Sequence, residues 1–155
     1  MQRLMLSLHL LMIVKQLGTQ FSLKDLGNLH FFLSVEVIPT SSGLFLSQHK
    51  YIRDLLYKTS MEGAKDVTIP LSTSVPLKLC DSTSSMDNNS YRQVIGSLQY
   101  LCMTRLYISY AINKLSHFMY KLTVTHWATV KRLLRYLKNT IFHGLQINSS
   151  AKLVL

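Results

Sequence analysis

The segment W-A-T-V-K-R-L-L-R-Y-L-K, from Trp127 to Lys138, spaces its apolar residues as an amphipathic helix does. At about 100° per residue, one third of the circumference is apolar. It comprises Trp127, Val130, Leu133, Leu134 and Leu137. A neighbouring arc, called here the basic arc, comprises Lys131, Arg132, Arg135 and Lys138. The apolar face is expected to pack in a core. The basic arc has two interpretations, a solvated surface or an anion-binding face.

Positive charge is concentrated in the same part of the chain. The 155 residues include 17 Lys and Arg against 7 Asp and Glu, a formal net charge of +10. All seven acids precede residue 88, and the nine bases that follow have no acid among them. Charge of one sign over one part of a chain favours a polyanionic partner, and nucleic acid is favoured over a membrane surface. The 48% hydrophobic content is enough for the core of one domain.

The first third of the sequence has mixed patterns. Leu4 to Val14 is an apolar run, which we interpret as a buried strand or helix, with a signal peptide as the second interpretation. Residues 31–38 alternate in polarity, which predicts one strand. A five-residue turn from Pro39 to Gly43 and a returning strand at Leu44 to Leu46 complete a predicted β-hairpin.

Helical patterns dominate the remainder. Ser47 is placed to cap a helix whose apolar stripe runs from Ile52 to Thr59. Periodicity is lost between about Asp66 and Ser90, which predicts a long connector. Two further helices are predicted at Tyr91 to Met103 and Ile108 to Leu122, before the basic amphipathic helix. The predicted fold class is therefore α+β.

Few residues suggest catalysis or metal binding. Two-metal nucleotidyl transfer requires clustered carboxylates, and the seven acids are scattered singly. Cys80 and Cys102 lack the spacing of a zinc site, and lone thiols fit a reducing, intracellular compartment. His117 and His126 are expected at the core edge or in a helix cap. The sequence thus predicts no catalytic residue, no metal, no cofactor and no small-molecule ligand.

Five stretches match the patterns of one family in the family's own order. They are Phe21–Gly27 (F-S-L-K-D-L-G), Phe31–Val37 (F-F-L-S-V-E-V), Gly43–Tyr51, Tyr91–Leu101 and His126–Thr140. They resemble F-x-M-K-D-L-G, Y-F-L-G-I-E-V, G-I-x-L-S-Q-x-K-Y, Y-R-x-x-V-G-x-L-x-Y-L and H-W-x-x-x-K-R-x-L-R-Y-L-K-G-T. With these patterns the chain resembles the reverse transcriptase of copia-type retrotransposon Pol polyproteins, over about residues 13 to 147.

The departures from the family bear on activity. The family's Y-V-D-D aspartates bind two Mg²⁺ ions, but the corresponding residues 1–11 hold no acid. The catalytic aspartate of ribonuclease H is expected after residue 147, where Ser150 to Leu155 holds none. Ser34 replaces the glycine of F-L-G, and Leu106 and Tyr107 replace the P-D of T-R-P-D. The chain is therefore expected to lie between two active sites and to contain neither.

The resemblance implies a division of the chain. Residues 1–65 would be a partial palm-like αβ segment, with the hairpin 31–48 near the primer end. Residues 66–90 would be a flexible connector and residues 91–147 a basic, thumb-like helical lobe. Residues 148–155 would be the truncated start of the link to ribonuclease H. The chain would normally pack on palm and ribonuclease H domains that are missing here.

These observations lead to a functional hypothesis and two alternatives. The hypothesis is a non-catalytic part of a reverse transcriptase that binds a DNA or RNA duplex weakly and without sequence preference, with no membrane partner. The candidate phosphate-binding residues are Lys131, Arg132, Arg135, Lys138, Arg92 and Arg105. The first alternative is an inert structural remnant with no molecular activity. The second is a secreted or membrane-associated peptide led by Leu4 to Val14.

Overall fold

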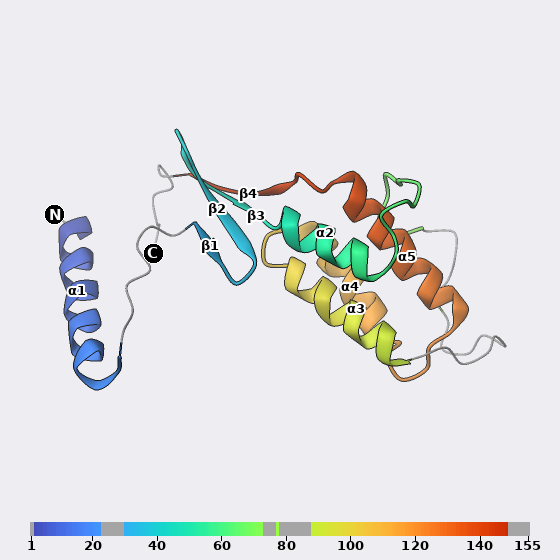
Figure 1. Ribbon diagram of the computed structural model, residues 1–155, viewed down its shortest axis with the longest axis horizontal. Coiled ribbons are helices and arrows are strands. Elements are labelled where there is room, and N and C mark those ends of the chain that lie inside the picture. Colours follow the sequence, from blue (N-terminus) through green and yellow to red (C-terminus); the bar gives the residue numbers. More distant parts are fainter. Residues whose placement is uncertain (1, 23–29, 73–76, 78–87, 149–155) are drawn as a thin grey trace.

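A helical bundle and an antiparallel sheet make up the two main parts of the fold (Figure 1). The computed structural model describes residues 2–22, 30–72, 77 and 88–148. The bundle contains α2 (His49–Lys58), α3 (Asn88–Leu101), η1 (Leu106–Ile108), α4 (Ser109–Ser116) and α5 (Val124–Asn139). The sheet has the order β1 (Phe31–Phe32), β2 (Val35–Thr40), β3 (Gly43–Ser47) and β4 (Gly144–Asn148). The α+β prediction is confirmed.

The core lies within the helical bundle. Helix α2 contributes Ile52, Leu55 and Leu56 to the same buried cluster as the apolar faces of α3, α4 and α5. Of the apolar arc predicted for α5, Val130, Leu133, Leu134 and Leu137 are buried, and Trp127 is partly buried against the same core. Each such side chain stabilises the fold by about 1.5–3 kcal/mol through the apolar area that it removes from water. The apolar stripes predicted for α2, α3 and α5 are confirmed, and one core spans both sides of the predicted connector.

The strand predicted over residues 31–38 is in fact two strands. Phe32 pairs with Val35, so that Leu33 and Ser34 form a two-residue turn between β1 and β2. Both turn residues have positive φ, 47° and 61°, as in the type I′ turn that matches the twist of a hairpin. The alternating pattern could not reveal this turn because its residues continue the alternation.

The second hairpin turn is tighter than predicted, and a distant strand completes the sheet. Thr40 pairs with Gly43, which leaves two residues in a turn where the sequence predicted five. Strand β4 lies antiparallel to β3, with Gly144 opposite Ser47. A Cβ at Gly144 would collide with the backbone oxygen of Leu46, so this strand can approach only with glycine there.

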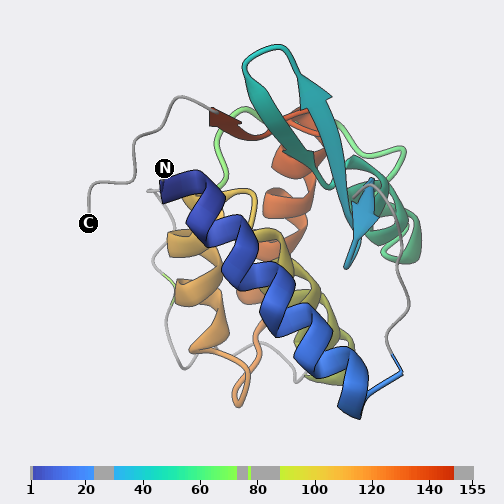
Figure 2. The ribbon, with the colours of Figure 1, turned by 90° about the vertical axis from the view of Figure 1, so that its left-hand side faces the viewer.

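Helix α1 (Gln2–Gln20) stands apart from the rest at one end of the molecule, beyond the sheet (Figures 1 and 2). The expectation of a buried element is half correct, because the run is helical but its described side chains are exposed. Leu11, Met12, Ile13 and Val14 are about half exposed or more. None of the described helices combines the length and apolarity needed to cross a membrane.

The helix predicted over residues 108–122 is shorter than expected. It begins with η1 and ends at Ser116, and turns carry Phe118 and Leu122 into the core without helical structure. Part of the predicted connector, Asp25 in the first family pattern, and Cys80 lie outside the described residues.

Replacing Ser34 by glycine is expected to stabilise the protein by about 0.5–1 kcal/mol, because a side chain at positive φ costs energy that glycine does not. Glycine is also the residue of the family pattern at this position. Urea unfolding of the full chain measures the change. The control is Ser41→Gly in the other turn, where φ is not positive, and it should give no gain. Equal effects of the two substitutions would contradict this explanation.

Candidate nucleic-acid interface

A capping box fixes the start of α5. The Thr123 hydroxyl accepts a hydrogen bond from the His126 N–H at 3.4 Å, and the Thr123 N–H donates to His126 Nδ1 at 3.2 Å. The buried His126 ring also stacks on Phe118, with 4.0 Å between the ring centroids. The capping role expected for this histidine is confirmed, and the reciprocal bonds satisfy two N–H groups at the helix end.

The segment after α2 crosses the basic arc of α5. Lys138 Nζ donates to the Ala64 carbonyl at 2.9 Å and lies 3.3 Å from the Asp66 carboxylate. Arg132 Nε donates to the Ile69 carbonyl at 3.2 Å. Lys138 therefore has an acidic partner, although no acid follows residue 88 in the sequence. Residues 64–69 are far from α5 in the sequence, but the fold brings them to the surface of this helix.

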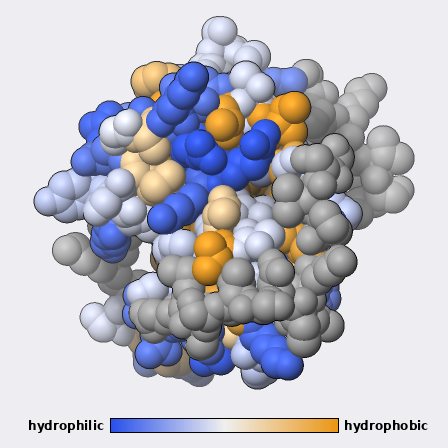
Figure 3. Space-filling view, turned by 90° about the vertical axis from the view of Figure 1, so that its right-hand side faces the viewer, coloured by the Kyte–Doolittle hydropathy of each residue, from blue (hydrophilic) through white to orange (hydrophobic). Residues whose placement is uncertain are grey.

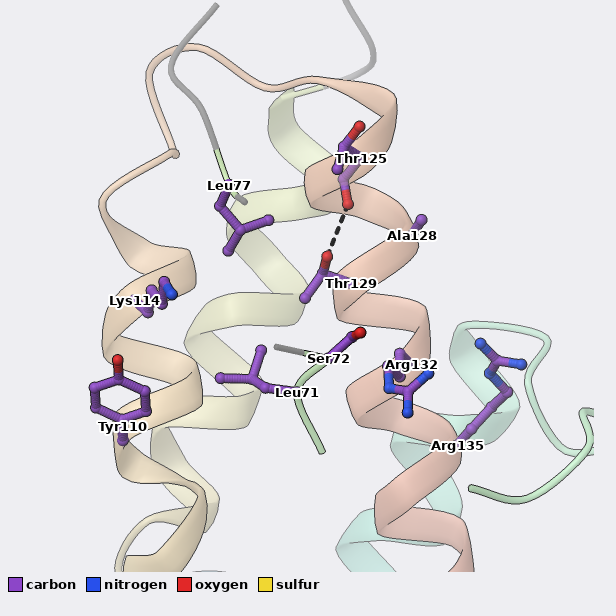
Figure 4. A pocket seen from close by; sticks show the side chains of 10 residues that line it. All are labelled: Leu71, Ser72, Leu77, Tyr110, Lys114, Thr125, Ala128, Thr129, Arg132 and Arg135. Carbon is purple, nitrogen blue, oxygen red and sulfur yellow. Dashed lines mark hydrogen bonds between the residues drawn. The ribbon is translucent and has the colours of Figure 1, made fainter. Parts of the chain in front are cut away.

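The other two cations of the arc, Lys131 and Arg135, differ in their exposure. Lys131 is exposed, with its ammonium 6.0 Å from the centre of the Trp127 ring. Arg135 is partly buried, and its Nε has no hydrogen-bond partner among the described residues. Arg132 and Arg135 line a pocket of about 480 Å³ between α4 and α5, which also includes Lys114 and Tyr110 of α4 (Figure 4).

Lys114 extends the positive surface, and the sequence analysis missed it. It is an exposed residue in the last turn of α4. The available signal was a cation on the polar side of a predicted helix in the acid-free part of the chain. That signal does not specify which helix lies beside α5. Figure 3 views the bundle end of the molecule and shows hydrophilic surface interrupted by apolar patches.

Arg105 is a structural residue, which corrects its inclusion among the phosphate-binding candidates. Its side chain is fully buried. The guanidinium donates to the carbonyl oxygens of Thr140, Ile141 and His143 at 2.7–2.8 Å. Burial lowers the pKa of Arg105 from its ordinary value, and interactions with Tyr107 partly oppose this shift. A group enclosed in this way cannot reach a phosphate on the surface.

Arg92 is available at the surface of α3. It is exposed, and its guanidinium carbon lies 5.9 Å from the centre of the Tyr120 ring. Tyr120 is itself 87% exposed, so this contact leaves the charge accessible to solvent. Arg92 therefore stays a candidate, on a different helix from the basic arc.

The acids of the described residues do not fit the two Mg²⁺ ions of the family's polymerase site. Glu36 lies 4.0 Å from His49, and Asp66 contacts Lys138. Asp54 and Glu62 are exposed at separate positions. Within the described part of the chain, no three side chains of His, Cys, Asp or Glu group together as metal ligands would. We derive no metal-dependent step from these residues.

Comparisons with known proteins agree with the sequence patterns. Residues 7–73 match the family model of reverse transcriptase, described as RNA-dependent DNA polymerase. The chain is 44% identical over 145 residues to an uncharacterized mitochondrial protein of Arabidopsis thaliana, covering 92% of this chain and 59% of that protein. It is 46% identical over 139 residues to the retrovirus-related Pol polyprotein from transposon RE1 of the same plant.

A tobacco relative, the retrovirus-related Pol polyprotein from transposon TNT 1-94, is 36% identical over 133 residues. The alignments cover 90% and 80% of this chain for the RE1 and tobacco proteins, but 10% of each Pol polyprotein. The chain therefore spans a small part of those relatives and 59% of the mitochondrial one. No solved structure matches the chain.

Arg105→Lys is expected to destabilise the protein by about 2–4 kcal/mol, because an ammonium cannot reproduce the planar fork that reaches three carbonyl oxygens. Urea unfolding followed by circular dichroism measures the loss. The matched control is Arg92→Lys, at an exposed site, which should change stability by no more than about 0.5 kcal/mol. A surface role for Arg105 would instead make the two substitutions equally mild.

Proposed function

We propose that this chain, which belongs to the reverse transcriptase family of retrotransposon Pol polyproteins, binds nucleic-acid duplex weakly and without sequence preference through α5 and performs no nucleotidyl transfer by itself. The phosphate-binding residues are Lys131, Arg132 and Arg135, with Lys138 in competition with Asp66. The duplex corresponds to the template and primer of RNA-directed DNA synthesis.

The clustering of cations on one side of α5 is the observation that carries this proposal. The buried face of the helix fixes its orientation, so that the basic arc is turned away from the core. Asp66 is the acid found in contact with the arc among the described residues. Cations that are held on a rigid helix suit phosphates, whose contacts give affinity but carry no sequence information.

Two features favour low affinity. Lys138 already has an anionic partner, Asp66. A phosphate at that position therefore adds only the difference between its own interaction energy with Lys138 and that of the carboxylate. The bond of Arg132 to Ile69 engages Nε, although the guanidinium has two further nitrogens that can donate to phosphate. The non-catalytic part of the proposal is supported by the described residues, among which no three His, Cys, Asp or Glu side chains group together, because nucleotidyl transfer needs ligands for two cations about 3.5–4 Å apart.

The inert remnant is the second candidate function. The observation that favours it is the use of two candidate cations within the structure, since Arg105 is buried and Lys138 is paired. In that case Lys131, Arg132 and Arg135 would be solvated surface residues. Binding measurements separate the two candidates.

Binding to a fluorescein-labelled B-form duplex should weaken with salt, with a slope of log affinity against log salt near −0.9 × 3, or about −2.7. This corresponds to a loss of roughly 40-fold between 50 and 200 mM salt. Asp66→Asn frees Lys138, so it should tighten binding and steepen the slope to about −3.6. Fluorescence anisotropy measures both quantities. Asp54→Asn, at an exposed acid, controls for the change in net charge.

Replacement of Lys131, Arg132, Arg135 and Lys138 by Gln should flatten the slope and weaken every duplex alike. The charge-matched control replaces Lys15, Lys50, Arg53 and Lys58 by Gln, which removes the same charge from α1 and α2. If both quadruple variants bind as the original chain does, the basic arc is solvated surface and the inert remnant is the better description.

The purified chain should not extend a primer on any template in Mg²⁺ or Mn²⁺, because no three His, Cys, Asp or Glu side chains among its described residues group together to hold metal ions. Gel-resolved primer extension with labelled primer measures this. A mock purification from cells that lack the gene is the control for contaminating polymerase. Metal-dependent extension in the chain's sample alone would refute the non-catalytic part of the proposal.

A further inference from the structure

The pocket between α4 and α5, called here the α4–α5 pocket, is not explained by duplex binding. Figure 4 shows Tyr110 and Lys114 on the α4 side, Thr129 and Arg132 on the α5 side, and Leu71 and Leu77 between the two helices. Its volume of about 480 Å³ falls in the range of sites for small organic groups, roughly 300–1,000 Å³. A duplex is too wide to enter such a space.

The lining residues have two kinds of chemistry. Lys114 and Arg132 supply positive charge from opposite walls. Arg135 is also a lining residue, but Figure 4 shows its guanidinium on the side of α5 that faces away from α4. Tyr110 is 71% exposed, which leaves much of its ring uncovered. Leu71 and Leu77 add apolar surface, and no acid is among the described residues that line the pocket. This combination fits a ligand with a flat apolar part and an attached anion.

We propose that the α4–α5 pocket takes one unpaired nucleotide of a single-stranded nucleic acid, with its base against Tyr110 and its phosphate between Lys114 and Arg132. This inference rests on the proposed function and deepens it, because it adds single strands to the nucleic acids that the chain binds. Base stacking on an aromatic side chain is tolerant of sequence, as are phosphate contacts. Paired bases are stacked within the duplex and cannot enter, so the pocket selects unpaired ones.

Duplex binding by the basic arc and single-strand binding in the α4–α5 pocket can be tested separately. Lys131 lies outside the pocket, and Tyr110 lies outside the basic arc. Arg132 and Arg135 belong to both the basic arc and the pocket, so replacing them would not distinguish duplex binding from single-strand binding. Tyr110 is the better choice, because its replacement changes no charge and removes little buried area.

The test compares Tyr110→Leu with the original chain, using a fluorescein-labelled oligothymidylate of about 12 nucleotides and a blunt duplex of the same length. Loss of one stacked base should weaken single-strand binding by roughly 5-fold to 100-fold and leave duplex binding within about twofold. The matched control is Tyr57→Leu on α2, because Tyr57 is also 71% exposed and does not line the pocket. Circular dichroism verifies that each variant is folded.

A second measurement reports on the base directly. A single strand that carries 2-aminopurine should lose fluorescence when its base stacks on Tyr110, and Tyr110→Leu should abolish that loss. If Tyr110→Leu and Tyr57→Leu bind the single strand equally, the pocket proposal is wrong, while salt-dependent duplex binding would still support the proposed function. If the original chain binds neither probe, both proposals fail.

Discussion

The fold depends on the polar contacts made by the loop that follows α3. The chain crosses between sheet and bundle twice, once at Gln48, between β3 and α2, and once at residues 140–143, between α5 and β4. Thr104 donates to the buried Gln48 side chain at 2.6 Å, and Arg105 donates to three carbonyls of residues 140–143. The loop after α3 thus forms hydrogen bonds with both connections between the sheet and the bundle. These carbonyls lie at the C-cap of α5 and just beyond it, so a buried guanidinium beside them satisfies polar groups that would otherwise be costly to bury.

This arrangement gives a physical meaning to several residues of the family patterns. Gln48 and Thr140 belong to the stretches that resemble the family, and Thr104 and Arg105 match the T-R of T-R-P-D. Each of the four takes part in the contacts between bundle and sheet. The glycine that the family has in place of Ser34 suits a turn position with φ of 61°. These patterns therefore describe a scaffold. They predict the fold well and say little about whether a given surface still binds its ligand.

The structure shows which parts of the fold could be predicted from sequence. The buried faces of α2, α3 and α5 were predicted because a helix repeats its apolar residues locally. Strand β4 was missed because five residues pair with a segment about a hundred positions away, and such pairing leaves no local pattern. The candidate site was predicted in part. Counting charges identified the basic arc, but it could not show that Arg105 is buried or that Asp66 reaches Lys138.

The same contacts determine how the proposed interface responds to its ligand. Residues 64–69 lie against two cations of the basic arc, so a phosphate at Lys138 would compete with Asp66. Lys131 lies beside the Trp127 ring and contacts no acid among the described residues. Under the proposed function, affinity comes mainly from Lys131 and the two arginines. Lys138 adds only the difference between the interaction energies of a phosphate and of the Asp66 carboxylate. The segment after α2 thereby acts as an internal competitor for the ligand. Weak binding is then a property of how the fold places residues 64–69, in a chain whose net charge of +10 alone suggests a stronger interaction.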